Sequence, residues 1–493
     1  MPSYRKISLS ASLLLICLWF SSGLFAGAVL DQEEILALAE QHGLSSDRIA
    51  VSVAALPDGG PLFAMNESVP MVVASNMKLI TSAAALCMLG PAYEFKTELL
   101  MMGRLDSAGM LHGDLLVRGG ADPNISGRFA AGPTSIFESW ARAIKTLGVA
   151  AISGDIVADD RIFDREFVHP AWPSDQLTFW YTAPVSGLSL NDNCIDLTII
   201  PASQVDAPPI IRMSPVTSYV SLQNACVTRR KVSKPLVLYR TPSTNNITVR
   251  GHVRHGAAPW RGSVTVHNPS LYFVHVMWET FERCGIRIGG GPRLAYGTEY
   301  TDAREGASAL VHKSTLASSV SVMNKRSQNL YAEQIFKLLG HEVMADGSFD
   351  GGRRAIESFL ESIGADDPAC RISDGSGLSS AGRLTARQIA TVLCHMYRSP
   401  HRADFMNSLP SAGTDGTLEN RMDDPGLRGR IIAKTGYVSG ANALSGYFFP
   451  REGTPMAFSV LVNGIKSGKN SEAKALQDDL CRALAGALGD GSR

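Results

Sequence analysis

The stretch that decides the fold is "MVVASNMKLITSAAAL", residues 71–86, where Ser75 and Lys78 stand three positions apart at the start of an apolar run. The apolar spacing, and the Gly-Pro that follows at 90–91, predict a helix from about Ser75 to Leu89. Positions three apart share one face of a helix, so we expect the hydroxyl and the ammonium to meet.

This pair has the features of an activated nucleophile. Ser75 lies near the helix N-terminus, where the positive end of the macrodipole stabilises a developing alkoxide. Burial disfavours the charged form of lysine, so Lys78 in an apolar setting has a lowered pKa and can take the serine proton. The pattern Ser-x-x-Lys is common, however, and this chain repeats it at Ser3–Lys6 and Ser471–Lys474. The pair alone therefore does not identify an enzyme.

The bulk composition is that of a globular protein large enough for several domains. The chain has 493 residues, of which 45% are hydrophobic and 19% charged. Its 46 basic and 46 acidic residues cancel, and no basic stripe is visible. We therefore expect no nucleic-acid partner.

The N-terminus has the pattern of a secretory signal peptide covering residues 1–28. Arg5 and Lys6 precede the apolar run "LLLICLWF" (13–20), and "AGA" (26–28) offers small residues for cleavage. A membrane anchor is the alternative, but the apolar run is short and is soon interrupted by Ser and Gly. No later segment is apolar enough over a sufficient length to span a bilayer. The mature protein is thus expected in the periplasm, or outside a cell that has a single membrane.

The cysteines and histidines give no sign of a metal site or a cofactor. Seven cysteines remain after residue 28; they are scattered, and no Cys-x-x-Cys occurs. The 11 histidines form no cluster. We expect no metal and mostly buried free thiols, with a Cys194–Cys226 pair left open.

The two ends of the chain predict one α/β (α+β) domain. The runs at 49–56 and 61–66 flank a Pro-Asp-Gly-Gly turn and indicate a hairpin. Near the C-terminus, further strands are predicted at 429–438, 442–450 and 456–464, with a helix at 471–487. The simplest arrangement puts these five strands in one antiparallel sheet flanked by helices.

Between these ends the chain makes a long excursion. Short strand-like runs punctuated by Pro, Gly and Asn fill this region and predict inserted, mainly-β domains. The expected organisation is a signal peptide (1–28), the first part of the main domain (29–95), the insertion (96–305) and the second part (306–493). Helices are predicted in this second part at 318–340, 351–364 and 385–399.

Two further motifs lie downstream of the Ser-x-x-Lys. Ser327-Gln328-Asn329 lies just before or inside a predicted helix, and Lys434-Thr435-Gly436 lies in a predicted strand. In an extended strand the Lys and Gly share one face, and the Gly lets a substrate backbone approach closely. Each motif alone has a structural explanation: a helix cap, a solvated lysine or a bulge. The order Ser-x-x-Lys, Ser-x-Asn, Lys-Thr-Gly is that of β-lactamases and penicillin-binding proteins.

The chain resembles the D-alanyl-D-alanine carboxypeptidase/endopeptidase family of class C low-molecular-mass penicillin-binding proteins (peptidase family S13). Ser75 and Ser327 are 252 positions apart, far more than a compact β-lactamase allows, and this family inserts domains between these two motifs. Four more stretches carry the resemblance: "GDLLVRGGADPN" (113–124), "APVSGLSLNDN" (183–193), "SDGSGLS" (373–379) and "SLPSAGTDGTL…AKTGYVSGANALSGY" (408–447).

The resemblance implies a β-lactamase/transpeptidase-like fold and a serine DD-peptidase that cleaves D-Ala-D-Ala ends or D-Ala cross-links of peptidoglycan stem peptides. It also implies that β-lactams acylate the enzyme. The implied catalytic residues are Ser75 (nucleophile), Lys78 (general base), Ser327 and Asn329 (proton relay and substrate holding). The implied substrate-binding residues are Lys434, Thr435, Gly436 and Tyr437, with the N–H groups of Ser75 and Tyr437 as oxyanion hole.

The chain departs from the family pattern at three positions. Tyr437 stands where Thr or Ser is usual, Ser380 where an Arg is frequent, and Gln328 where Asp is common. The first two departures concern the recognition of the substrate carboxylate and of an acidic stem side chain.

Some interpretations stay open. Asp374 and Ser376 either line the site or form a turn. The resemblance places Asp159, Asp160 and Phe163 where the inserted domain approaches the substrate side chain, but a surface turn is the favoured interpretation. The alternative functions are a β-lactamase or esterase on the same scaffold, and a non-catalytic wall-binding module.

Overall fold

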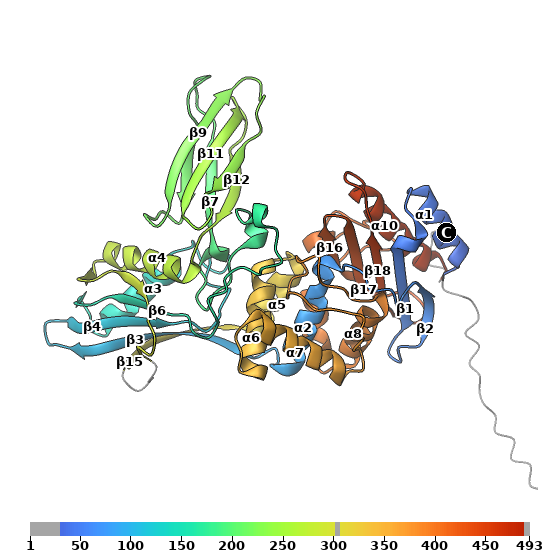
Figure 1. Ribbon diagram of the computed structural model, residues 1–493, viewed down its shortest axis with the longest axis horizontal. Coiled ribbons are helices and arrows are strands. Elements are labelled where there is room, and N and C mark those ends of the chain that lie inside the picture. The colour runs from blue at the N-terminus through green and yellow to red at the C-terminus, as the bar shows by residue number, and fades with distance from the viewer. Residues whose placement is uncertain (1–29, 301–305, 488–493) are drawn as a thin grey trace, which may run out of the picture.

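The computed structural model describes residues 30–300 and 306–487 (Figure 1). The predicted signal peptide, residues 1–28, lies outside the described residues. Helices are combined with antiparallel and parallel strand pairs, which confirms the α/β prediction.

A five-stranded antiparallel sheet unites the two ends of the chain, as the sequence predicts. Its strand order is β16-β17-β18-β1-β2. The two ends meet where β1 pairs with β18, from Ile49 opposite Val462 to Ala55 opposite Met456. The strands are β1 (Ile49–Ala55), β2 (Pro61–Met65), β16 (Ile431–Val438), β17 (Ala441–Phe448) and β18 (Met456–Asn463).

This sheet is buried on both faces because successive side chains of a strand point to opposite sides. In β18, Ala457 and Leu461 join the core on one face, whereas Phe458 and Val460 join the core on the other. Helices α1 (Gln32–Gln41) and α10 (Asn470–Ala487) cover the second face (Figure 1). Helix α8 (Ala386–Arg398) packs directly on the first face. The core on this side also includes α2 (Met77–Met88), α5 (Leu316–Lys325), α6 (Asn329–Met344), α7 (Phe349–Ser362) and α9 (Arg402–Ser408).

Helix α2 lies at the centre of this helical layer. Every residue from Met77 to Leu86 is buried, including Lys78. A helix that is largely apolar on all sides belongs in the interior of a large domain, and α2 is of this kind apart from Lys78, Thr81 and Ser82.

The predicted helix at 318–340 is two helices, α5 and α6. Ser327, between them, has φ of 56°. This left-handed conformation cannot continue a right-handed helix, so the chain turns here. The turn places Ser327 at a corner instead of on a continuous helix face.

The middle segment leaves and returns through a pair of antiparallel strands. Strand β3 (Glu94–Leu105) pairs with β15 (Ala307–Thr315), beginning with Glu94 opposite Thr315. Both belong to a seven-stranded sheet with β4 (Met110–Arg118), β5 (Ala151–Ile152), β6 (Ile156–Asp159), β13 (Arg287–Ile288) and β14 (Pro292–Leu294).

A second unit of the middle segment contains two three-stranded sheets, and it extends away from the rest (Figure 1). Their orders are β10-β11-β9 and β12-β7-β8. The strands are β7 (Cys194–Ile200), β8 (Ile210–Ser214), β9 (Ser221–Arg229), β10 (Val237–Arg240), β11 (Asn246–Arg254) and β12 (Trp260–Thr265).

The mainly-β prediction missed two helices of the middle segment, α3 (Ser135–Thr146) and α4 (Pro269–Arg283). They pack together through Phe137 and Phe273, whose ring centroids are 4.9 Å apart. Parallel pairs such as β4 with β6 were also not predicted, because such pairing depends on partners distant in sequence. The domain limits at 95 and 305 stay predictions.

All seven cysteines within the described residues are free thiols, so the open Cys194–Cys226 pair is not formed.

Phe273 tests whether the middle segment carries a core of its own. Its ring is fully buried in a core separate from that around α2. Phe273→Ala should lower the free energy of unfolding by roughly 3–5 kcal/mol, because it leaves a cavity. Thermal and denaturant unfolding measure the effect. Phe129→Ala, at an exposed phenylalanine of the same segment, should change stability by no more than about 0.5 kcal/mol. Equal effects of the two substitutions would contradict this assignment.

Candidate active site

Ser75 is presented at a sharp turn into α2. It lies in a short 3₁₀ turn, Ala74–Asn76, directly before the helix. Ala74 has φ of 47°, a left-handed conformation that a non-glycine residue adopts only when its surroundings hold it there. Gly377 packs on this turn: a Cβ on Gly377 would lie 1.8 Å from the Ala74 carbonyl oxygen. The turn directs Ser75 into a cavity of about 780 Å³.

The Lys78 ammonium is the centre of the site. Its Nζ donates to Ser75 Oγ at 3.0 Å, to Asn329 Oδ1 at 2.7 Å and to the Ser376 carbonyl at 2.9 Å. The side chain is fully buried. Three acceptors from three separate segments therefore replace the water that a lysine head group ordinarily keeps.

Burial changes the protonation of Lys78. Desolvation lowers its pKa to about 7, although the negative charges of Glu333 and Asp374 act in the opposite direction. A large fraction of the amine is therefore neutral near pH 7, and its lone pair lies within hydrogen-bond distance of the Ser75 hydroxyl.

The second and third motifs meet at the opposite wall of the cavity. Lys434 Nζ donates to Ser327 Oγ at 2.9 Å and to the Thr435 carbonyl at 2.8 Å. Burial, and then the charge of Lys78, lower the pKa of Lys434 well below its usual range. A carboxylate that entered the cavity would favour the charged form again.

A buried asparagine fixes α2 to strand β16. Asn76 donates from Nδ2 to the Lys434 carbonyl at 2.8 Å, and its Oδ1 accepts from Ser445 at 2.6 Å. This contact joins the first and third motifs directly. The sequence analysis did not assign Asn76 a role.

Strand β16 passes close to Ser75. A Cβ on Gly436 would lie 3.1 Å from the Ser75 nitrogen and 2.9 Å from the Val73 carbonyl oxygen. The glycine thus allows the strand to approach the nucleophile turn. Tyr437 lines the cavity beyond it, with 57% of the residue exposed.

A threonine that the sequence analysis did not single out supplies a hydroxyl beside Thr435. Thr435 Oγ1 donates to Thr417 Oγ1 at 2.8 Å, and both residues line the cavity. Position 437, where the family pattern has the hydroxyl of a Thr or Ser, is occupied by Tyr437 and lines the same cavity.

Two polar residues of the loop "SDGSGLS", Asp374 and Ser376, have different roles. Asp374 is a turn residue, since its carboxylate accepts from the backbone N–H groups of Gly377 at 2.8 Å and Ser379 at 2.7 Å. Ser376 touches the site through its carbonyl, which accepts from Lys78. The loop therefore acts as a support behind Lys78.

Sequence reasoning missed Glu333, which organises this support. It is fully buried in α6, four positions after Asn329. Its two carboxylate oxygens accept from the backbone N–H groups of Gly375 at 2.9 Å and Ser376 at 2.7 Å. Burial, and then the charge of Asp374, raise its pKa to about 8. The available signal was a carboxylate one turn after Asn329, on the same side of the predicted helix.

The middle segment also reaches the site. Asn329 donates from Nδ2 to the Tyr181 carbonyl at 2.8 Å, and Trp172 donates from Nε1 to Asp374 at 2.9 Å. Trp180 and Tyr181 line the cavity. The insertion therefore contributes part of the wall of the site.

The interpretation of Asp159 and Asp160 as part of a surface turn was wrong. Both residues are buried. Asp159 pairs with Arg161 at 2.7 Å and Asp160 with Arg165 at 3.0 Å, so they hold the segment that leads toward the site.

The described residues contain neither a cluster suited to a metal ion nor a helix suited to crossing a membrane. Residues 30–300 and 306–487 contain no group of three or more His, Cys, Asp or Glu placed to hold a metal ion. In the same part of the chain, no helix has the length and apolar character needed to cross a membrane.

With this geometry established, comparison with known proteins gives the family. The model of the D-Ala-D-Ala carboxypeptidase 3 (S13) family matches residues 31–485. The chain belongs to this family. The family prediction made from the motifs is confirmed, and the protein is a hydrolase of the serine DD-peptidase class.

Two members of the S13 family illustrate the similarity. A D-alanyl-D-alanine carboxypeptidase of Actinomadura sp. (strain R39) is 32% identical over 447 residues, which cover 88% of this chain and 81% of the relative. The D-alanyl-D-alanine carboxypeptidase DacB of Haemophilus influenzae is 25% identical over 413 residues, covering 82% of each protein.

Solved structures agree on the fold. The crystal structure of penicillin binding protein 4 (dacB) from Haemophilus influenzae matches with a TM-score of 0.79 at 23% identity, covering 92% of this chain and 99% of that chain. The same protein complexed with a β-lactam matches with a TM-score of 0.75 at 22% identity, with equal coverage.

Glu333→Gln tests the support behind Lys78. An amide has one acceptor oxygen, so its NH₂ would face a backbone N–H, and one buried donor would lose its partner at a cost of about 1–3 kcal/mol. We expect a lower melting temperature and acylation by a fluorescent penicillin at least tenfold slower. Glu342→Gln is the matched control, because this glutamate of the same helix bonds Tyr93 at the surface. Acylation of the Glu333→Gln variant at the same rate as the wild type would contradict this role.

Proposed function

We propose that this protein is an exported serine DD-peptidase that hydrolyses D-Ala-D-Ala ends, and D-Ala cross-links, of peptidoglycan stem peptides through an acyl-enzyme on Ser75. The observation that carries the proposal is the fully buried Lys78, 3.0 Å from the Ser75 hydroxyl and with its pKa lowered to about 7. Such a base serves a hydroxyl nucleophile without a histidine.

Acylation begins with a proton transfer. Neutral Lys78 takes the Ser75 hydroxyl proton while Oγ attacks the carbonyl carbon of the penultimate D-Ala. The charge that develops on the carbonyl oxygen is stabilised by the N–H groups of Ser75 and Tyr437. The close approach of Gly436 to the Ser75 nitrogen supports this pairing of donors.

The leaving amine needs a proton when the tetrahedral intermediate collapses. Lys78 carries the proton taken from Ser75, and Ser327 lies on the opposite side of the cavity. Because Lys434 donates to the Ser327 oxygen, the Ser327 hydroxyl hydrogen is free to point at the leaving nitrogen. Ser327 gives its proton to the leaving nitrogen and takes one from Lys78, which becomes neutral again. Water then attacks the acyl carbon and gives a proton to Lys78. Lys78 returns this proton to Ser75 Oγ as the acyl–oxygen bond breaks and the shortened peptide leaves.

The carboxylate next to the scissile bond is held at the far end of the cavity. Lys434 supplies positive charge. The hydroxyls of Thr435 and Thr417 donate hydrogen bonds to the substrate carboxylate. Such a carboxylate is present at a free D-Ala end, and also on the D-configured carbon that carries the amine of a cross-link. The same groups therefore serve a carboxypeptidase and an endopeptidase.

An arginine side chain is absent from one expected position. Ser380 lines the cavity where the family often has arginine. Nearby, Arg383 donates to the Gly382 carbonyl at 2.9 Å and also to the carbonyl of Ser380. Recognition of an acidic stem side chain by a guanidinium at this point is not part of the proposal.

Ser75→Ala tests the nucleophile. Residues 29–493 are mixed with a fluorescent penicillin and run on a denaturing gel beside the variant. We expect a stable labelled band that the variant lacks, together with release of D-Ala from a peptide ending in D-Ala-D-Ala. Absence of a band with intact penicillin would favour the non-catalytic module, whereas absence of a band with destroyed penicillin would favour a β-lactamase.

The pH dependence of acylation tests Lys78 as the base. Only the neutral amine accepts the proton, and the neutral fraction grows as pH rises through a pKa of about 7. The second-order rate constant for penicillin acylation should therefore rise about tenfold per pH unit below 7 and level off above it. Rapid-mixing measurements from pH 5 to 9 give the profile. A rate that stays constant from pH 5 to 7 would exclude Lys78 as the titrating base.

A further inference from the structure

A second cavity adjoins the active site. It has a volume of about 890 Å³, within the range of about 300–1,000 Å³ typical of ligand sites. Trp180 lines both cavities. Gln328 lines the second cavity, while its neighbours Ser327 and Asn329 line the first. A single molecule can therefore occupy both spaces by crossing the wall that these residues form.

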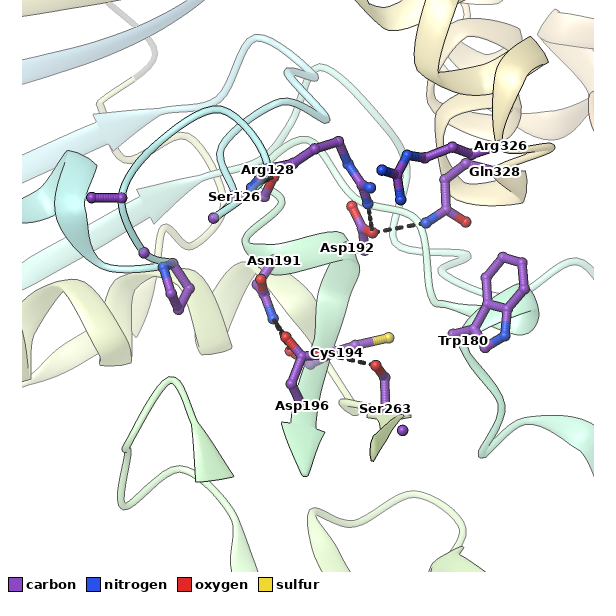
Figure 2. A pocket seen from close by; sticks show the side chains of 15 residues that line it. Ser126, Arg128, Trp180, Asn191, Asp192, Cys194, Asp196, Ser263, Arg326 and Gln328 are labelled. Atoms are coloured by element: carbon purple, nitrogen blue, oxygen red, sulfur yellow. Dashed lines mark hydrogen bonds and ion pairs between the residues drawn. The ribbon is translucent and has the colours of Figure 1, made fainter. Parts of the chain in front are cut away.

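One wall of the second cavity is formed by a hydrogen-bonded cluster of polar side chains (Figure 2). Arg128 and Gln328 both point at Asp192: Arg128 forms an ion pair with it, and Gln328 Nε2 donates to its Oδ2 at 2.8 Å. Gln328 is only 6% exposed. Three polar atoms of this group are buried and find no hydrogen-bond partner among the described residues: Gln328 Oε1, Asp192 Oδ1 and Arg128 Nε. Buried polar atoms of this kind favour a ligand that supplies their missing hydrogen bonds.

The backbone at this wall is held in an unusual conformation. Asn191, Asp192 and Asn193 have φ of 51°, 55° and 53° in succession. The turn belongs to "APVSGLSLNDN", a stretch of the sequence resemblance to which the proposed reaction gives no role. Such strain is typical of ligand-binding segments, and here it places Asn191 and Asp192 on the cavity surface.

The remaining lining indicates the chemical class of the ligand. Asp196 accepts from Ser263 at 2.6 Å and from Asn191 at 2.9 Å. Within the described residues it has no cationic partner, and the exposed guanidinium of Arg326 has no anionic one. Two guanidinium groups thus face two carboxylates, so the cavity does not select for net charge.

Trp180 adds a flat apolar surface, since the residue is 43% exposed beside these donors and acceptors. A ligand without net charge, rich in hydroxyl and amide groups and with an apolar ring face, fits this lining. N-acetylated amino sugars have this chemistry.

We propose that this second cavity binds the glycan to which the stem peptide is attached, while the D-Ala end of the same peptide lies at Ser75. The inference rests on the proposed function. An extended peptide spans at most about 3.6 Å per residue, so the sugar at the other end of a short stem has to lie near the catalytic cavity. The adjoining cavity, reached past Trp180, is in this position.

Paired substrates test the proposal. One is a stem peptide ending in D-Ala-D-Ala, and the other is the same peptide carrying its disaccharide of N-acetylated amino sugars. For the wild type we expect kcat/KM at least tenfold higher on the sugar-linked substrate. Asp196→Ala and Ser263→Ala should lower this preference at least fivefold while changing kcat/KM on the bare peptide less than twofold. Asp206→Ala, at a carboxylate with a 63% exposed side chain outside the cavity, should retain the preference.

Equal kcat/KM of the wild type on both substrates would overturn the glycan site and leave the peptidase function intact. Equal losses on both substrates in Asp196→Ala, with unchanged melting temperature and penicillin labelling, would also overturn it. Direct binding separates the sugar from the peptide: penicillin-acylated wild type should bind the free disaccharide, and acylated Asp196→Ala should not. Binding of the bare stem peptide to the acylated enzyme, lost in this variant, would assign the cavity to peptide. Failure of the wild type to hydrolyse either substrate would contradict the proposed function itself.

Discussion

The arrangement of the site depends on one constraint, the burial of the Lys78 ammonium. An amine enclosed in the interior must find acceptors in the protein, and this one finds three. They come from the turn before α2, from the start of α6 and from the loop at 373–379. Satisfying one nitrogen therefore brings three distant segments to one point. The same burial that requires these contacts also lowers the pKa, so structural support and chemical activation of Lys78 have one cause.

A layer of buried polar groups stands behind this centre. Glu333 holds the loop whose carbonyl faces Lys78, and Asn76 holds the strand that carries Lys434. Neither group reaches the cavity, yet each fixes a group that does. Precise placement in an active site requires such fixed supports, because a donor displaced by an ångström loses most of its effect. The strained residues Ala74 and Ser327 are consistent with this arrangement, since both lie next to supports that hold them.

The middle segment has its own hydrophobic core and also contacts the catalytic region. It leaves through β3 and returns through β15 as a paired ribbon, and its own helices give it a separate hydrophobic core. Its loop at 172–181 nevertheless returns to the catalytic region, where it contacts Asn329 and Asp374. Residues of both units therefore line the cavity beside Ser75. This geometry places the second cavity beside the first, and Trp180 of the long insertion lines both.

The sequence by itself determined the motifs, their order, the family and the central sheet. These are local or periodic properties: alternation marks a strand, and spacing along a helix puts Ser75 and Lys78 on one face. It did not determine the turn at Ser327 or the parallel pairs of the middle sheet, because tertiary contacts decide these. Glu333 and Asn76 were missed for the same reason. Helices α3 and α4 have buried apolar residues at helical spacing, a local signal that the mainly-β prediction missed. The carboxylate behind the loop at 373–379 and the hydroxyl pair of Thr417 and Thr435 depend on burial and distance, which exist only in the folded chain. The direction of the Lys78 pKa shift was predicted from the sequence, but its size depends on complete burial in the fold.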